Sequence, residues 1–218
     1  MRVRKKKWAR PELENTSFVV IDPEKYKGQW KMEFSNSNPI YLELGCGTGR
    51  FISENVVKNP DKNYIGIDLK DEILVYAKRT VEDILYSKDE VIENIRLIPM
   101  QIAFIDKIFG ANEISRIYIN FCNPWPKRRQ NRQRLTHNIF LEKYIGFLKS
   151  SSQIWFKTDD KGLFEDSQEY FKSCGFGIKY QTYDLHNSGF NENITTEYEE
   201  KFTSMGMPIM FLIAELQK

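Results

Sequence analysis

The feature that most limits the fold of this 218-residue chain is a regular alternation of strand-like and helix-like segments. From residue 39 onward, short apolar runs alternate with longer segments whose apolar residues recur at helical spacing. This alternation is typical of a mostly parallel sheet with helices on both faces. We therefore expect an α/β, Rossmann-like domain in residues 39–218, preceded by a basic arm in residues 1–38.

Seven segments are predicted to be strands, and the last two are expected to pair antiparallel. The predicted strands are 40–44, 64–69, 95–100, 116–121, 153–157, 176–183 and 208–215. The predicted helices cover 50–58, a segment that ends near Ser87, 139–148 and 163–173, with Gly175 as the stop signal of the last one. Sheets of this kind bind ligands at the carboxyl ends of their strands, so polar residues at these ends are the candidates for ligand binding.

A glycine-rich turn follows the first predicted strand. Gly45, Gly47 and Gly49 alternate with other residues, which differs from the G-x-G-x-x-G spacing that faces a dinucleotide pyrophosphate. Glu43, two positions before the first glycine, would repel a pyrophosphate but suits a cationic amino acid. S-adenosylmethionine offers such a cation, its ammonium group, beside a sulfonium.

Two polar residues end the next two predicted strands. Asp68 can accept hydrogen bonds from both ribose hydroxyls of a nucleoside, and the amide of Gln101 suits the adenine edge. The alternatives are a plain tight turn or an NAD site. Glu43, the glycine spacing and Asp68 together favour S-adenosylmethionine over both.

Positive charge is concentrated in two short stretches. The first ten residues hold six basic side chains and residues 127–134 hold five, with no acid in either stretch. The rest of the chain carries 21 basic and 30 acidic residues. Two basic clusters on an acidic body favour RNA as a partner, the alternative being a merely solvated surface.

The three cysteines, Cys46, Cys122 and Cys174, are odd in number and lack metal-ligand spacing. We therefore expect no disulfide framework and no metal. The first seven residues lack the apolar stretch of a secretory signal, and we expect a cytoplasmic protein.

The fourth predicted strand leads into Asn123-Pro124-Trp125-Pro126-Lys127 and then a basic run. Two prolines fix φ on either side of the tryptophan, so this loop is stiff. The segment resembles the acid-Pro-Trp-Pro-Lys turn of the bacterial tRNA (guanine-N7)-methyltransferase family. Further matches to that family are Arg134-Leu135, Lys157-Thr158-Asp159 and Thr196-Glu197-Tyr198-Glu199.

The resemblance implies a class I methyltransferase that modifies N7 of a guanine in the tRNA variable loop, at position 46. It implies S-adenosylmethionine as cofactor and S-adenosylhomocysteine as product. The matching cofactor-binding positions are Glu43, Gly45, Gly47, Gly49, Asp68, Gln101 and Asn123. The substrate-binding positions are Lys127, Asp159, Thr196 and Glu199, and the RNA-contacting arginines are Arg128, Arg129 and Arg132. No obligatory protein partner is implied, and a monomer or a homodimer is expected.

Three positions depart from the family pattern. Asp68 replaces the common glutamate, and Gln101 and Asn123 replace aspartates. Guanine N7 carries an unshared electron pair, so its attack on the methyl group requires no prior proton removal, and positioning is the main demand. Asp159 and Asn123 are the candidate catalytic residues, with Asp159 opposing the positive charge that grows on the purine.

Other interpretations of these motifs stay open. Thr196 and Glu199 form a capping-box pattern, and Asp160 suits a helix N-cap. Asn123-Pro124 also begins the Asn/Asp-Pro-Pro-Tyr motif of amino-methyltransferases, although Trp125-Pro126 breaks the rest of it. A non-catalytic RNA-binding module is the third alternative.

Overall fold

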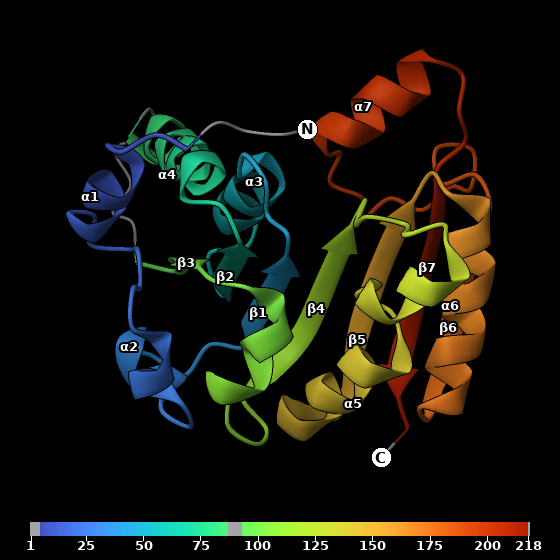
Figure 1. Ribbon diagram of the computed structural model, residues 1–218, viewed down its shortest axis with the longest axis horizontal. Helices are drawn as coiled ribbons and strands as arrows, with labels where there is room; N and C mark the ends of the chain where they lie inside the picture. The colour runs from blue at the N-terminus through green and yellow to red at the C-terminus, as the bar shows by residue number, and fades with distance from the viewer. Residues whose placement is uncertain (1–4, 87–92, 218) are drawn as a thin grey trace. The chain divides into compact units, whose positions relative to one another are not determined.

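A computed structural model describes residues 5–86 and 93–217 of the chain. The chain divides into two compact units, Met1–Phe109 and Gly110–Lys218. Each unit combines part of the sheet with its own helices, and Figure 1 labels these elements.

The first unit contains three parallel strands in the order β3-β2-β1. Its elements are β1 (Ile40–Leu44), α3 (Arg50–Lys58), β2 (Asn63–Asp68), α4 (Asp71–Tyr86), β3 (Ile95–Pro99) and the 3-10 helix η2 (Ile102–Lys107). Glu43 pairs in register with Gly66, and Asp68 with Pro99. These pairings bring the carboxyl ends of the three strands to one edge.

The segment before β1 belongs to the first unit and packs against its other elements. It contains α1 (Ala9–Glu14), the 3-10 helix η1 (Pro23–Tyr26) and α2 (Trp30–Glu33). Trp30 is fully buried and donates its indole N–H to the carbonyl of Ile108 at 2.7 Å. Val19 forms a parallel bridge with Leu97 of β3. The separation of residues 1–38 from residues 39–218 as domains stays a prediction, and residues 1–4 lie outside the described part.

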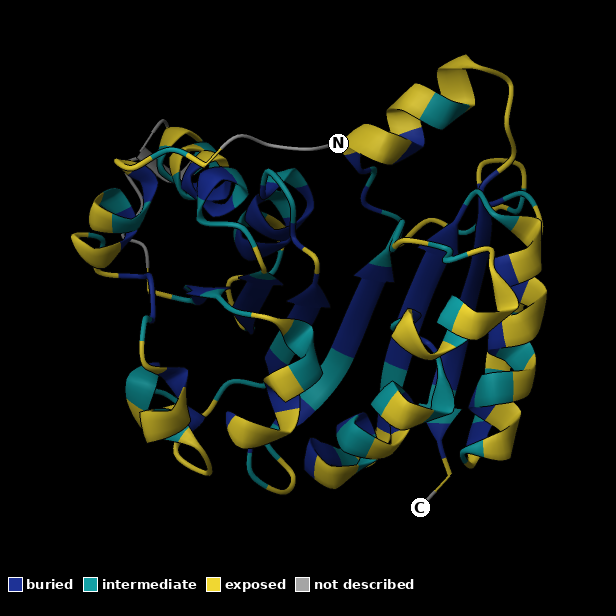
Figure 2. Cartoon of the chain, in the orientation of Figure 1, coloured by how far each residue is buried: buried dark blue, intermediate teal, exposed yellow. Residues whose placement is uncertain are grey.

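The second unit contains four strands in the order β4-β5-β7-β6, with β7 antiparallel to both of its neighbours. Its elements are β4 (Ile114–Asn120), the 3-10 helix η3 (Arg128–Gln133), α5 (Asn138–Phe147), β5 (Leu148–Thr158), α6 (Lys161–Ser173), β6 (Phe176–Thr182), α7 (Glu197–Ser204) and β7 (Met210–Leu216). Buried residues concentrate in the strands and along one side of the helices (Figure 2).

Seven mostly parallel strands with an antiparallel terminal pair confirm the predicted α/β fold class. The predicted end of the second helix at Ser87 lies outside the described residues. The predicted start of β5 at residue 153 is wrong, because the strand begins at Leu148. Its polar first half pairs Leu148 with Ile114 through the backbone and contains an irregularity, where Ser151 has a φ of 58°. Backbone pairing of this kind leaves no apolar alternation in the sequence.

In the part of the chain that the structure describes, we find no helix that combines the length and the apolar character needed to cross a membrane.

Candidate functional site

The glycine-rich turn joins β1 to α3, as expected. Gly47 has a φ of +55° and Gly49 a φ of +84°, a region that side chains with a Cβ rarely adopt. A Cβ at Gly49 would lie 2.7 Å from Cα of Ala77, so α3 and α4 pack too closely there for any other residue. At Gly47 nothing lies within 4 Å of the corresponding point. The same turn therefore combines tight packing behind it with open space at its tip.

Asp68 lies against this turn from the end of β2. Its Oδ2 accepts a hydrogen bond from the backbone N–H of Gly47 and its Oδ1 one from that of Lys70, both at 3.2 Å. Burial raises the pKa of the Asp68 carboxyl, and these backbone bonds oppose part of the rise.

A second carboxylate gives the turn a negative electrostatic environment. Glu43 at the end of β1 is buried. The pKa of the Cys46 thiol is raised well above its usual value, first by burial and then by the charges of Asp68 and Glu43. Burial disfavours any charge, but the two carboxylates disfavour an anion and attract a cation, so Glu43 and Asp68 fit the ammonium and sulfonium groups of S-adenosylmethionine better than a pyrophosphate.

Gln101 lies two residues beyond β3 and is exposed. The N–H of the preceding Met100 donates to the carbonyl of Asp68 at 3.0 Å, which places Gln101 near the strand end that carries this aspartate. The first unit thus brings together Glu43, the three glycines, Asp68 and Gln101.

The segment after β4 is held in an unusual conformation. Phe121 and Trp125 have φ values of 50° and 45°, which are rare for bulky side chains. The Asn123 side chain accepts a hydrogen bond from the N–H of Trp125 at 3.1 Å. Arg134 donates to the carbonyl of Pro124 at 2.7 Å and also pairs with Asp166. The loop that the prolines were expected to stiffen is therefore held by hydrogen bonds within residues 123–134 and by an ion pair with α6.

The basic run after this loop divides into two kinds of residue. Lys127, Arg128, Arg129 and Arg132 are exposed around η3, as an RNA-contacting surface requires. Arg134 is buried, with 5% of its surface exposed. Its guanidinium group binds Pro124 and Asp166 of the protein itself, and the composition of the basic run does not indicate this structural role.

Thr196 and Glu199 form the predicted capping box at the start of α7. The Thr196 hydroxyl accepts from the N–H of Glu199 at 3.0 Å, and Glu199 Oε2 accepts from the N–H of Thr196 at 3.3 Å. This confirms the capping interpretation of the motif.

Glu199 is also the centre of a buried polar cluster that the sequence did not indicate. The Lys157 ammonium lies 3.0 Å from Glu199 Oε2 and 2.8 Å from the carbonyl of Ile194. Glu199 Oε1 accepts from the Asn193 amide at 2.6 Å and lies 3.2 Å from His186 Nε2. Each carboxylate oxygen thus has two neighbours of donor type, which is close to its full capacity. The one available signal was Lys157 itself, a lysine at the end of an apolar strand that requires a buried partner.

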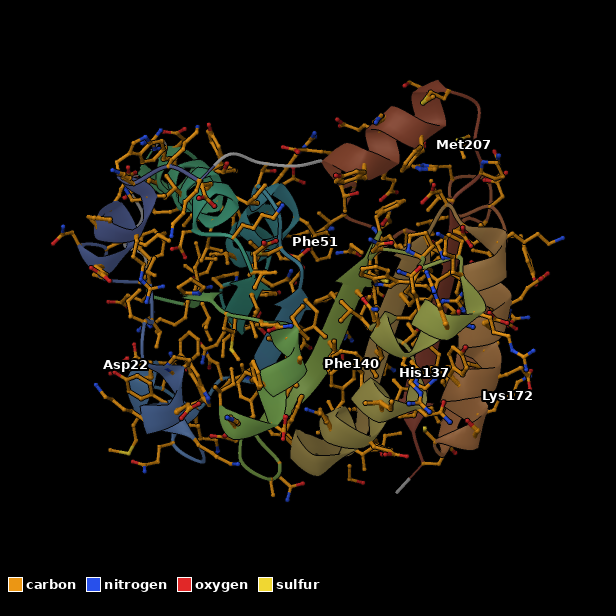
Figure 3. All side chains as sticks on the ribbon, viewed as in Figure 1. Asp22, Phe51, His137, Phe140, Lys172 and Met207 are labelled. Atoms are coloured by element: carbon orange, nitrogen blue, oxygen red, sulfur yellow. The ribbon has the colours of Figure 1, made fainter. Side chains whose placement is uncertain are left out.

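Asp159 and Asp160 follow β5 directly. Asp160 is the N-cap of α6, and its Oδ1 accepts from the N–H of Leu163 at 2.6 Å, as predicted. The cap bond therefore comes from Asp160, and Asp159 is half-buried beside it. His137 (labelled in Figure 3) caps α5 in the same manner, with a bond from the N–H of Ile139.

Comparisons with known proteins first define the class. Residues 37–212 match a family model described as "Putative methyltransferase". The 16S rRNA methyltransferase KamB superimposes with a TM-score of 0.64 at 10% identity, over 88% of this chain and 94% of that one. The 16S rRNA (adenine(1408)-N(1))-methyltransferase from Catenulisporales acidiphilia gives a TM-score of 0.59 at 12% identity, over 91% and 93%. The fold and the matched family are those of a methyltransferase.

Full-length relatives then define the family. A tRNA (guanine-N(7)-)-methyltransferase of Clostridium tetani is 60% identical over 217 residues, covering 100% of both chains. The protein of the same description from Clostridium acetobutylicum is 57% identical over the same span. This chain belongs to the tRNA (guanine-N(7)-)-methyltransferase family.

Proposed function

We propose that this protein transfers a methyl group from S-adenosylmethionine to N7 of a guanine in tRNA. The finer assignment is position 46, in the variable loop. The observation that carries the proposal is the glycine turn bordered by Glu43 and Asp68, in a chain 60% identical to a protein described as carrying out this reaction.

The first unit supplies most of the cofactor-binding residues. Asp68 accepts the ribose hydroxyls, Glu43 attracts the ammonium group, and the backbone of Gly45 to Gly49 allows close approach. Gln101 contacts the adenine edge. Asn123 is also assigned to the cofactor, and its side chain is held by the bond from the N–H of Trp125. The bound cofactor supplies the methyl group, and no metal is required for its transfer.

The second unit supplies the residues for the guanine. Lys127 and the Thr196 hydroxyl suit the O6 acceptor, and the Glu199 carboxylate suits the N1–H and N2–H donors. For Glu199, contact with the base requires that it give up one of its present bonds. Asp159 opposes the positive charge that develops on the purine, because a carboxylate stabilises the charged transition state more than the neutral base.

The surrounding chain supports tRNA as the macromolecular substrate. Arg128, Arg129 and Arg132 are exposed on η3, and the six residues of η3 include no acid. They position phosphates without specifying sequence. We propose a cytoplasmic enzyme that acts as a monomer or a homodimer without an obligatory protein partner and releases S-adenosylhomocysteine.

The test is to incubate the protein with bulk tRNA and S-adenosylmethionine carrying a labelled methyl group, and then to identify the labelled nucleoside. The expected product is 7-methylguanosine, mapped to position 46 by strand scission at the modified base. Label on an exocyclic amine would replace the proposal with an amino-methyltransferase. Binding of cofactor and tRNA without any label would replace it with a non-catalytic RNA-binding protein.

A further inference from the structure

Three aromatic rings lie together on the second unit, beside the residues assigned to the guanine. The rings of Phe121 and Tyr198 are stacked, with centroids 6.1 Å apart and an interplanar angle of 21°. Phe202 lies 5.9 Å from Phe121 and 6.2 Å from Tyr198. Phe121 comes from the end of β4, whereas the other two rings come from α7. The cluster therefore joins the loop of Asn123 to α7, the helix that Thr196 caps.

The exposure of these rings differs. Phe121 and Phe202 are half-buried, but 56% of the Tyr198 surface is exposed. One face of the ring therefore packs against Phe121 while more than half of the surface of the residue stays in water. Isolated exposed aromatic residues are ordinary. A stacked pair with one accessible ring, between two residues assigned to the substrate, indicates a binding surface for a flat partner.

The backbone holds both rings rigidly. Phe121 adopts a φ of 50°, a strained value for a bulky residue, while its N–H donates to the carbonyl of Lys157 at 3.0 Å. Tyr198 occupies the first turn of α7, whose start is fixed by the capping box and by the pair of Glu199 with Lys157. A ring held in this way loses little conformational entropy when a base stacks on it.

We propose that Tyr198, supported from below by Phe121, stacks on the guanine that is methylated. This inference rests on the proposed function and names a binding residue for the same reaction. Purine bases stack on aromatic side chains at single-stranded or flipped positions of RNA, and a base buried in a tRNA fold must unstack to be modified. Tyr198 replaces the stacking partner that the guanine loses.

Stacking on Tyr198 also favours the methylated form of the base. N7 methylation makes the purine cationic, and the face of a tyrosine ring attracts cations. The same attraction acts while the positive charge develops, so the ring lowers the barrier as well as binding the substrate. The cost of this arrangement is slower release of the methylated product.

The experiment measures equilibrium affinity for a short RNA with one guanosine, and for the same RNA with 7-methylguanosine at that position. A slightly acidic buffer keeps the methylated base cationic. Wild-type protein should bind the methylated RNA about 2- to 30-fold more tightly. Tyr198→Phe should keep this preference, and Tyr198→Leu, which retains an apolar side chain without a ring, should lower it to the part that the Asp159 charge supplies.

Tyr183→Leu is the matched control, because Tyr183 is a second half-exposed tyrosine of the same unit that packs edge-on against Phe164. Equal affinity of wild-type protein for both RNAs overturns the proposal. It is equally overturned if Tyr198→Leu keeps the full wild-type preference, or if Tyr183→Leu lowers it. These affinities require no turnover, so they decide the stacking role even if the protein places no methyl group on tRNA.

Discussion

The glycine turn of the first unit and the start of α7 in the second unit use carboxylates in opposite ways. At the glycine turn of the first unit, Asp68 accepts two backbone hydrogen bonds beside a turn whose tip is open at Gly47. At the start of α7 in the second unit, Glu199 is fully buried and both of its oxygens are surrounded by donors. The first arrangement suits a ligand that brings a positive charge. The second already contains its cation, Lys157, within the protein.

The comparison shows that a match to a family motif does not by itself determine the role of a side chain. Both residues are acids at the end of a strand or the start of a helix, and both occupy positions that the family uses for binding. Their environments distinguish a carboxylate that can receive a ligand directly from one that must first give up a bond that holds a helix in place. Substitutions in both units test this difference.

The largest expected effect belongs to the buried ion pair. Glu199→Gln leaves the Lys157 ammonium buried without its counter-charge, and we expect the free energy of unfolding to fall by about 3–5 kcal/mol. Urea-induced unfolding measures this change. The double variant Lys157→Met with Glu199→Leu should recover much of the loss, because neither charge is then buried alone. Unchanged stability with a raised KM for tRNA would leave Glu199 with the guanine-binding role alone.

The next effect concerns Asp159, which we place opposite the charge that develops on guanine. Asp159→Asn keeps the size and hydrogen-bonding ability but removes the charge, so kcat should fall on the order of 10²-fold with little change in KM. Single-turnover rates across neutral pH provide the measurement, and the wild-type profile should show no rise from an essential base. Asp160→Ala is the control, since loss of the α6 cap should cost about 1 kcal/mol of stability and leave kcat unchanged. A full rate in Asp159→Asn would exclude the electrostatic role.

The effect of Asp68 should appear in cofactor affinity. Asp68→Ala removes charge-assisted bonds worth roughly 1.5–3 kcal/mol each, which calorimetry with S-adenosylmethionine would detect. Because burial raises the pKa of Asp68, wild-type affinity should weaken as the pH falls through that raised value and the carboxylate is neutralised. The stability of the protein without cofactor should change in the opposite direction. It should rise as the pH falls through the raised pKa of Asp68, because protonation removes a poorly solvated charge. An affinity that is independent of Asp68 would remove this residue from the cofactor site.

The smallest effect is expected from the exposed arginines. Replacing Arg128, Arg129 and Arg132 with glutamine should reduce the slope of log affinity for tRNA against log salt by roughly two to three. The matched control replaces three lysines of the same unit that are paired with acids: Lys161, Lys172 and Lys179. That control should leave the slope nearly unchanged. Equal slopes in both triple variants would make η3 an ordinary solvated surface.

The sequence predicted the elements with sharp local signals. The boundaries of β1 and α3 match because an apolar run, a glycine turn and an amphipathic helix follow one another without a gap. The caps at Asp160 and Thr196 were predictable because capping depends on residues three positions apart.

The features that escaped prediction depend on distant partners or on backbone strain. Lys157 and Glu199 are 42 positions apart, and nothing near either residue indicates the other. The burial of Arg134 depends on Pro124 and Asp166, which reach it from a loop and a helix. The positive φ angles of Phe121 and Trp125 have no signature in residue type, because glycine and asparagine normally occupy that region.

The bridge between Val19 and Leu97 has a further consequence for aggregation through the edge of the sheet. A terminal strand such as β3 presents a row of unpaired backbone groups, and another chain can add to it. The N–H of Leu97 donates to the carbonyl of Phe18, and the N–H of Val20 donates to the carbonyl of Leu97, both at 2.9 Å. The protein thus covers part of this edge with its own early residues, so a chain shortened by its first twenty residues would expose a template for aggregation.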